Sequence, residues 1–350
     1  MSEGGALPED TAWKRRLETG SKGSLGKMDA REALAFADFA LNRVSRTFAL
    51  NIQVLPRPLR DQVLYAYLYC RMADTIEDDA TLPALDKARL LHAFAALFNE
   101  DGAGVGARGN PAAFNSFDAF KSFEAFPSLL PASFLGTDDW EKILLERAPV
   151  VLQAYPTFPA PARAAIARCV TEMCDGMADF ALRHERGNAE ARSGEARSGA
   201  PSETAESTEP LIRTVAELDQ YCYYVAGTVG IMLCDLFVAH SRMHAPQIDE
   251  ARAARMRALC VSFGLGLQLT NILKDLRDDS DRGVVWLPAD LLAAEGLTPA
   301  TYFLPENRAA AGRVYQVLFA KARAHLAEAL EYTCLIPRWH RRLQIGRAHV

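Results

Sequence analysis

The sequence YLYCRMADTIEDD, residues 67 to 79, decides the fold. On an α-helix, successive residues are about 100° apart, and four polar residues of this stretch then fall within roughly 60° of one another. The residues on that stripe are Tyr67, Arg71, Asp74 and Asp78. Apolar residues flank the stripe, which indicates a helix buried in the fold. Asp74 and Asp78 are one turn apart, so they offer two carboxylates at one place, as Mg²⁺ sites in proteins commonly do.

A second acidic stretch, NILKDLRDD at residues 271 to 279, repeats this arrangement after the apolar run FGLGLQLTNIL. Its polar residues share one helix face: Gln268, Asn271, Asp275 and either Asp278 or Asp279. A single stretch of this kind is usually a charged surface. Two of them in apolar helices predict facing carboxylates that hold several Mg²⁺ ions. Because Mg²⁺ is usually shared with substrate phosphates, the expected ligand is a diphosphate.

Composition limits the class of protein. The chain has 350 residues, of which 49% are hydrophobic and 24% charged, which is typical of a globular protein with a large core. The net charge of -5 gives no reason to expect a nucleic-acid partner. The seven cysteines show no CxxC spacing, so we expect free, buried thiols in a reducing compartment, the cytoplasm.

No secretory signal is expected at the N-terminus, because Lys14, Arg15 and Arg16 are not followed by an apolar run. The most apolar span, Tyr223 to Ala239, contains Asp235 and is shorter than the ~20 residues of a membrane-spanning helix. It predicts a core helix. We therefore expect a soluble monomer, with peripheral association with a membrane as the alternative.

Helical periodicity recurs along the chain, and no alternating strand pattern or Gly-rich nucleotide loop is found, so the sequence predicts an all-α fold. Residues 1–28 are expected to be disordered, and 29–344 to form one domain with a flexible, low-complexity insert at about 186–210. The last residues, IGRAHV (345–350), match one translated frame of a common sequencing adapter. We expect them to be an artefact that follows a truncation near Gln344. Helices are expected to begin near Asp29 and Leu59 and to cover 82–99, 139–154, 159–185, 250–281, 287–295 and 307–333.

Five stretches in this order resemble the squalene/phytoene synthase family, the head-to-head prenyl synthases. They are VSRTF (44–48), YLYCRMADTIEDD (67–79), GMADF (176–180), YCYYVAGTVG (221–230) and LQLTNILKDLRDDSDRGVVWLP (267–288). The resemblance implies a single-domain isoprenoid-synthase bundle with a central cavity between the two acidic helices. It also implies two prenyl diphosphate substrates, Mg²⁺, and condensation through a cyclopropyl diphosphate. In squalene synthases NADPH then delivers a hydride, whereas phytoene and dehydrosqualene synthases lose a proton.

The resemblance also implies roles for particular residues. It places Asp74, Asp78, Asp275 and Asp279 as metal ligands, and Tyr67, Arg71 and Tyr221 as catalytic residues. Substrate-binding roles fall to Ser45, Arg46, Thr47, Phe48, Gly176, Asn271, Lys274 and Arg282, with Phe48 lining the tunnel for the prenyl chain. The chemistry of the cationic residues suits these roles, since guanidinium groups bind phosphate oxygens in a bidentate manner.

The motifs divide between two branches of the family. DTIEDD and VSRTFALNI resemble squalene synthase, whereas YCYYVAGTVG and the RG-x-x-x-LP at 282–288 look at least as much like phytoene synthase. Val284, Val285 and Trp286 stand where the commoner bacterial pattern has Arg and Tyr. The leading hypothesis is squalene synthase with NADPH, and the alternative is phytoene or dehydrosqualene synthase. Remoter readings are a terpene cyclase or chain-elongating synthase, and a non-catalytic subunit that binds prenyl diphosphate.

Overall fold

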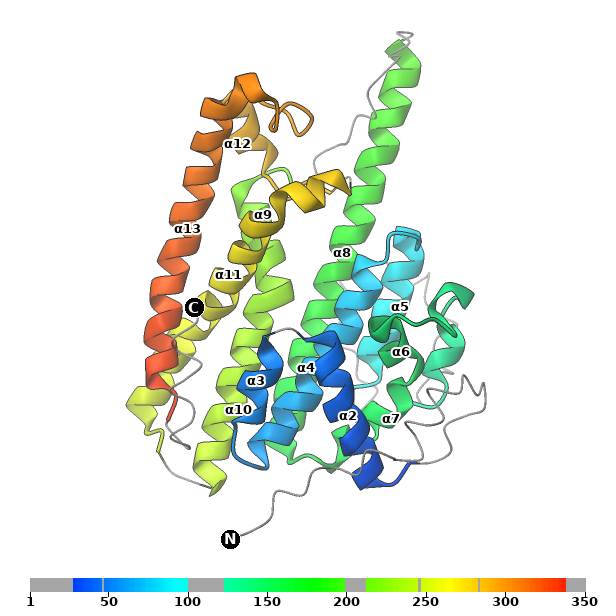
Figure 1. The fold of residues 1–350 in the computed structure, drawn as a ribbon, viewed down its shortest axis with the longest axis vertical. Coiled ribbons are helices and arrows are strands. Elements are labelled where there is room, and N and C mark those ends of the chain that lie inside the picture. The colour runs from blue at the N-terminus through cyan, green and yellow to red at the C-terminus, as the bar shows by residue number, and fades with distance from the viewer. Residues whose placement is uncertain are drawn as a thin grey trace. The chain divides into compact units, whose positions relative to one another are not determined.

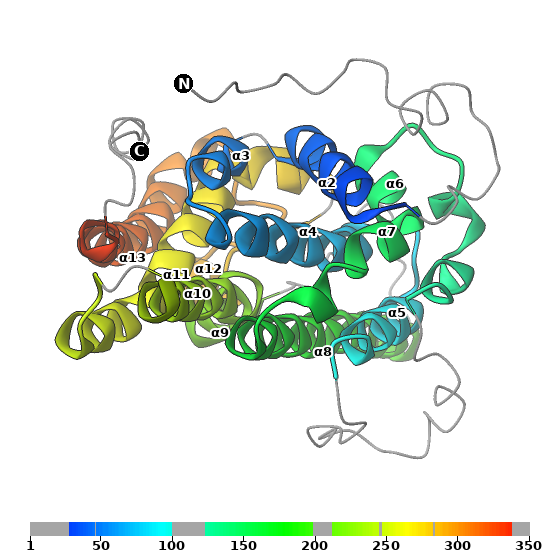
Figure 2. The ribbon, with the colours of Figure 1, turned by 90° about the horizontal axis from the view of Figure 1, so that it is seen from below.

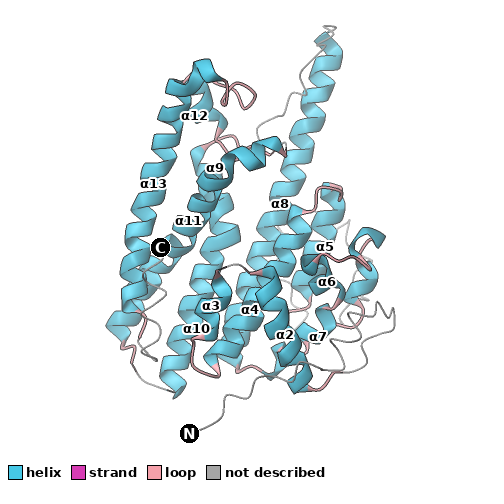
Figure 3. Cartoon of the chain, in the orientation of Figure 1, coloured by secondary structure: helices cyan, strands magenta, loops and turns pink. Residues whose placement is uncertain are grey.

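The computed structural model describes residues 28–45, 47–99, 123–198, 212–244, 247–282 and 284–337, with the backbone alone for 186–198. These residues form helices and turns with no strand (Figures 1 and 3), which confirms the all-α prediction. The segments expected to be disordered (1–28) or artefactual (345–350) lie outside the described residues, apart from Met28.

The chain groups into two compact units, each assembled from separate stretches of sequence. The single domain predicted for 29–344 stays a prediction. Among the described residues, the first unit comprises those at 28–75 and 123–159, and the second comprises those at 76–99 and 160–337. The division falls inside helix α4 (Leu59–Asp78), which carries the first acidic stretch and begins where the sequence predicted. The central cavity implied by the family resemblance stays a prediction.

Short helices make up the described part of the first unit. Before α4 come α2 (Ala30–Val44) and α3 (Phe48–Gln53); after it come η2 (Phe126–Leu129), η3 (Ala132–Phe134), α6 (Trp140–Glu146), α7 (Ala148–Leu152) and η4 (Tyr155–Thr157). Asp29 begins α2 with a capping box in which Glu32 takes part. The single helix expected over 139–154 is instead two, because Pro149 has no N–H to continue α6 and occupies the first turn of α7.

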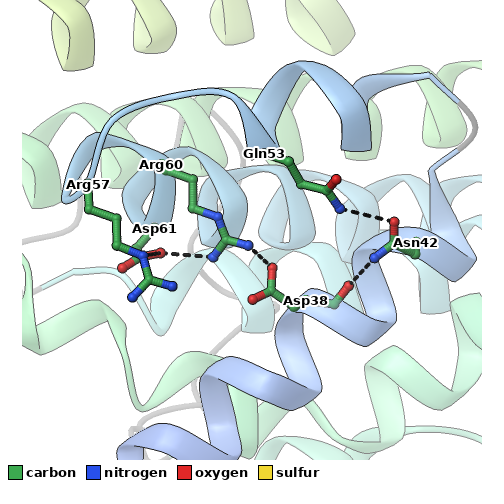
Figure 4. A network of polar contacts seen from close by, with 6 residues as sticks. All are labelled: Asp38, Asn42, Gln53, Arg57, Arg60 and Asp61. Atoms are coloured by element: carbon green, nitrogen blue, oxygen red, sulfur yellow. Dashed lines mark hydrogen bonds and ion pairs between the residues drawn. The ribbon is translucent and has the colours of Figure 1, made fainter. Parts of the chain in front are cut away.

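A partly buried network of ion pairs and hydrogen bonds joins α2 to α4 (Figure 4). The Arg60 guanidinium contacts the carboxylates of Asp38 and Asp61, the second at 2.9 Å. Burial lowers the pKa of Arg60, but its hydrogen bonds to these two carboxylates outweigh that effect and raise it. Asn42 extends the network by donating to the Asp38 carbonyl and accepting from Gln53 of α3. The network fixes the helices on either side of the Ser45–Phe48 segment.

The second unit contains the longest helices. They are α5 (Ala84–Ala96), α8 (Ala160–Ser198), α9 (Val215–Cys222), the π-helical turn η5 (Tyr223–Gly227), α10 (Thr228–His244), α11 (Glu250–Asp281), α12 (Ala289–Ala294), η6 (Pro305–Asn307) and α13 (Arg308–Leu335). Helix α5 lies along α8 and α11 along α13 (Figures 1 and 2), while α10 contacts both α8 and α11. Helix α8 runs into the first part of the segment at 186–210 whose flexibility was predicted, and that flexibility stays a prediction.

Small residues let α10 and η5 approach α11 closely. A Cβ added at Gly230 would lie 2.0 Å from the Cys260 carbonyl oxygen, and one at Gly264 would lie 2.1 Å from the Ala226 carbonyl oxygen. At Ala226 and Gly230 the structure shows a neighbouring helix, α11.

The core of the second unit includes its most apolar helices. Among the described residues, two helical stretches are long and apolar enough to cross a membrane, Val215–His244 and Glu250–Asp281. Half of the most apolar window in each is buried within the fold. The sequence predicted buried thiols; six of the seven cysteines are buried and Cys334 is exposed.

His240, with 3% of its surface exposed in α10, links stability to pH. Burial, together with His244, lowers the pKa of His240 from 6.5. The unfolded chain therefore takes up a proton near pH 6.5, and the folded chain only at lower pH. The free energy of unfolding should consequently fall as pH drops from 6.5 through the lowered pKa.

We expect urea unfolding at about pH 7.5 and about pH 5.5 to show a smaller fall in unfolding free energy for His240→Gln than for the unsubstituted protein. Burial also lowers the pKa values of His184 and His325, so the variant should keep part of the fall. An equal fall in both proteins would contradict the prediction for His240.

Candidate active site

The predicted catalytic residue Tyr67 lies beside Phe48 in the first unit. Their ring centroids are 5.8 Å apart, and the Tyr67 hydroxyl donates to the Val44 carbonyl at 3.2 Å. Phe48 is 42% exposed, which leaves part of its ring surface open to an apolar ligand. The structure therefore brings these two predicted residues together, while the tunnel for the prenyl chain stays a prediction.

Arg71, one turn after Tyr67, is the cation of the first acidic stretch. Its guanidinium lies 3.5 Å from the Glu141 carboxylate. Burial lowers the pKa of Arg71, but the Asp74 carboxylate and Tyr67 outweigh burial and raise it, so the charge is held firmly. The Nε atom is buried without a hydrogen-bond partner. Because buried donors are rarely left unbonded, Arg71 has a donor that an anionic ligand would satisfy.

Ser45, predicted to bind substrate, also stabilises the start of helix α3. The Ser45 hydroxyl oxygen accepts a hydrogen bond from the Ala49 N–H at 3.1 Å and so stabilises the start of α3. Thr47 is exposed and makes no capping bond. Arg46 lies outside the described residues. The phosphate-binding roles of these three residues stay predictions.

The three acidic residues at the end of the first acidic stretch, Glu77, Asp78 and Asp79, have different surroundings. Asp79 is buried and accepts hydrogen bonds from Thr81 and from the Leu82 N–H, so it closes the helix. Asp78 is exposed. Glu77, which the sequence analysis did not single out, lies within hydrogen-bonding distance of Tyr221. Of the predicted metal ligands in this stretch, Asp74 belongs to the first unit and Asp78 to the second.

The second acidic stretch occupies the last turns of α11. Asp275 forms an ion pair with the exposed Lys274 at 3.3 Å, and Asp279 forms one with Arg282. The side chain of Asp279 is 13% exposed, whereas Asp278 is exposed. Helical spacing did not decide whether Asp278 or Asp279 shares the polar face with Asp275. The smaller exposure of Asp279 favours it as the residue directed into the fold. Arg282, predicted to bind substrate, pairs with the predicted metal ligand Asp279, and its binding of substrate stays a prediction.

Tyr221 is the most enclosed of the predicted catalytic residues, with 4% exposure at the end of α9. Its hydroxyl donates to the Glu77 carboxylate at 3.3 Å. One face of its ring stacks on Trp286, with centroids 4.2 Å apart and planes 25° apart. Phe180 meets it edge-on at 5.3 Å. Residues from three other segments, Glu77, Phe180 and Trp286, therefore surround this one phenol.

Sequence reasoning missed three of these contacts. Glu77 lies inside the first acidic stretch but off its polar face, and Phe180 is the last residue of GMADF. Trp286 was noticed only as a departure from the family pattern. All three residues lie inside stretches that resemble the family, and this position could have marked them as candidates. Their contacts with Tyr221 could not be predicted, because contacts between residues far apart in the chain produce no periodic pattern in the sequence.

Gly176, predicted to bind substrate, makes room for a side chain of the protein. A Cβ at this position would lie 2.1 Å from Cγ of Tyr224, in the π-helical turn that follows Tyr221. The neighbouring Tyr223 donates to Glu172 at 2.8 Å, and burial together with that hydrogen bond raises the pKa of Tyr223 to about 12. Single π-helical turns within helices are frequent at functional sites, and this one sets the directions of Tyr223 and Tyr224.

The predicted magnesium site agrees with the chemistry of its residues. In the part of the chain that the structure describes, no three His, Cys, Asp or Glu side chains are grouped closely enough to hold a metal ion. Mg²⁺ does not require such a group, because it keeps several waters and is shared between one or two carboxylates and substrate phosphates. The four predicted ligands offer only carboxylate oxygens, which are hard donors. Their joint binding of Mg²⁺ stays a prediction.

An all-α fold with two aspartate-rich helices and a buried tyrosine agrees with the isoprenoid-synthase type that the sequence resemblance implies. The family model described as squalene/phytoene synthase matches residues 41–349. The chain belongs to the squalene/phytoene synthase family.

Individual relatives agree with this assignment. The chain is 28% identical over 292 residues to squalene synthase from Schizosaccharomyces pombe, covering 83% of this chain and 52% of that protein. It is 30% identical to squalene synthase ERG9 from Gibberella zeae, covering 83% and 51%. Lycopaoctaene synthase from Botryococcus braunii is 28% identical, with 68% and 40% covered. The chain thus spans about half the length of the curated squalene synthases it matches.

A solved complex of TcSQS with the ligand BPH1237 has a similar fold, with a TM-score of 0.61 and 26% sequence identity. The match covers 87% of this chain and 72% of that one.

Proposed function

We propose that the protein is a squalene synthase, which condenses two farnesyl diphosphates and reduces the product with NADPH. The observation that carries the proposal is the contact between Tyr221 and Glu77. It joins the buried tyrosine to Glu77, in the part of the first acidic stretch that belongs to the second unit, and that unit also holds the second acidic stretch. The squalene synthases among the relatives support the same reading.

The predicted site residues would have different roles in this reaction. Asp74, Asp78, Asp275 and Asp279 would hold Mg²⁺, which when bound stabilises the negative charge of a departing diphosphate. Arg71 would add a direct cationic contact through its unbonded Nε. The apolar residues around Tyr221, among them Phe180 and Trp286, would exclude water from a reactive carbocation.

The overall reaction releases two diphosphates. The first leaves as an allylic cation forms and alkylates the second substrate, and closure of the cyclopropane ring releases a proton. The second leaves when that intermediate ionises and rearranges. The last cation would then be reduced to squalene by the hydride that NADPH supplies when bound, or would lose a proton in the alternative branch.

One incubation series tests the proposal. The protein would receive farnesyl or geranylgeranyl diphosphate with Mg²⁺, with and without NADPH, and the extracted hydrocarbons would be identified by mass spectrometry. We expect squalene from farnesyl diphosphate only when NADPH is present. Dehydrosqualene or phytoene formed without NADPH would move the assignment to the alternative branch. Folded protein that consumes no diphosphate would favour the non-catalytic reading.

A phytoene or dehydrosqualene synthase is the second candidate. It is favoured by YCYYVAGTVG and by the RG-x-x-x-LP at 282–288, which look at least as much like phytoene synthase. The location of the protein in the cytoplasm, its monomeric state and any peripheral association with a membrane stay predictions.

A further inference from the structure

We propose that Trp286 is a positioning residue that fixes the ring of Tyr221, and that it thereby controls whether the cyclopropyl diphosphate is carried through to hydrocarbon or released. The proposal rests on the proposed function and assigns a role to a residue outside the predicted site. We call Phe180, Tyr221 and Trp286 the aromatic clamp.

The clamp holds Tyr221 from two directions. Trp286 covers a face of the ring at 4.2 Å and 25°, and Phe180 meets the ring at 5.3 Å and 71°. Aromatic pairs in such geometries stabilise a structure beyond the apolar area that they bury. The Tyr221 ring cannot turn about its Cβ–Cγ bond without displacing one of its neighbours.

The hydroxyl bond alone would not fix the ring. The Tyr221 hydroxyl lies 3.3 Å and 3.5 Å from the two carboxylate oxygens of Glu77, long for a bond between a hydroxyl and a carboxylate. The Cβ–Cγ torsion of tyrosine has a broad minimum, so this bond would tolerate a range of ring planes. The stacked indole of Trp286 therefore decides the plane of the phenol.

Trp286 is itself anchored at both ends of its segment. Before it, the Val284 N–H donates to the carbonyl of Asp279, in the second acidic stretch, at 2.9 Å. After it, the Ala289 N–H donates to the carbonyl of Ile212, shortly before α9, at 3.0 Å, and the side chain of Leu287 is fully buried. The segment 284–289 thus connects the second acidic stretch to the helix that carries Tyr221, and Trp286 is its contact with the phenol.

A reacting group that is misplaced by about 1 Å can cost about 100-fold in rate, because catalysis depends on the alignment of the reacting atoms. Leucine at position 286 would fill part of the space of the indole without offering a flat face. Phenylalanine would keep a flat face. The two substitutions therefore separate stacking from simple filling of the core.

The test measures steady-state kinetics and products for Trp286→Phe and Trp286→Leu with farnesyl diphosphate, Mg²⁺ and NADPH. We expect Trp286→Leu to lower kcat about 30-fold, with KM changed less than about threefold, and Trp286→Phe to keep kcat within about threefold. Trp286→Leu should also release a larger share of product as the cyclopropyl diphosphate. Tyr223→Phe is the matched control, because it removes a hydroxyl bonded to Glu172 from the neighbouring turn. It should leave kcat within about twofold of the unsubstituted value.

A second readout does not depend on activity. The stacked pair should contribute to the near-ultraviolet circular dichroism, so the changes caused by Trp286→Leu and Tyr221→Leu should be non-additive in the double variant. Additive changes, or a Trp286→Leu protein with unchanged kcat and product ratio, would overturn the proposal. So would equal losses of kcat in the Leu and Phe variants. Should Trp286→Leu not fold, Trp286→Met replaces it with the same expected losses.

The two proposals fail in different ways. If the unsubstituted protein consumes no prenyl diphosphate, the proposed function is wrong and the role of Trp286 in the reaction falls with it. The circular dichroism comparison then still decides whether Trp286 holds Tyr221. If the unsubstituted protein makes hydrocarbon and Trp286→Leu makes it equally well, only the positioning role is wrong.

Discussion

Replacing Asp275 with Asn should lower kcat/KM for farnesyl diphosphate about 1,000-fold, which corresponds to about 4 kcal/mol of transition-state stabilisation. The predicted role of Asp275 is to hold Mg²⁺ against the diphosphate, and an amide oxygen carries no full negative charge for that purpose. The loss of its ion pair with Lys274 should matter little for folding, because Lys274 is exposed and exposed pairs contribute about 0–1 kcal/mol.

The matched control is Asp281→Asn, which removes the same charge from the exposed last residue of α11. It should keep kcat/KM within about twofold, since it lies off the polar face of that helix. For Asp275→Asn, the Mg²⁺ concentration that gives half-maximal rate should rise, and the midpoint of thermal unfolding should stay near that of the unsubstituted protein. A folded Asp275→Asn enzyme with full activity would exclude Asp275 as a metal ligand.

Substituting Gly264 by Ala should destabilise the protein by about 2–3 kcal/mol. The new methyl group would lie 2.1 Å from the carbonyl oxygen of Ala226 and 2.5 Å from its carbonyl carbon. Both atoms belong to the backbone of η5. The clash with the new methyl group can therefore be removed only if α11 and η5 move apart. Alanine favours a helix over glycine by about 1 kcal/mol, which the clash must exceed for the net effect to be destabilising.

Gly312→Ala provides the opposite case in the same unit. Gly312 lies inside α13, and a Cβ there would meet no atom within 4 Å. The variant should therefore gain up to about 1 kcal/mol from helix propensity alone. Urea unfolding of both variants gives the comparison. If Gly264→Ala lowered the free energy of unfolding by no more than the change caused by Gly312→Ala, α11 and η5 would move apart without a cost in stability, and the prediction would be wrong.

Local pattern explains why much of the fold could be predicted from the sequence. Helix α4 begins at Leu59 because Pro56 and Pro58 end the preceding helical segment, and α11 begins after Asp249, whose side chain caps its first turn. The acidic stretches were visible for the same reason, since carboxylates spaced by one turn share a face. These signals act over a few residues, so the sequence alone determined the helices and the carboxylates on their polar faces.

Only the tertiary structure decided what surrounds those carboxylates. The pairing of Tyr221 with Glu77 and Trp286 joins residues that lie far apart in the chain, and no repeat or spacing marks such a pair. Gly176 could have faced a ligand or a helix, and it takes the ring of Tyr224 because the π-helical turn directs that ring toward α8. Side-chain contacts between distant segments depend on how whole helices pack, and packing is determined by the summed volume of many residues and not by any local pattern.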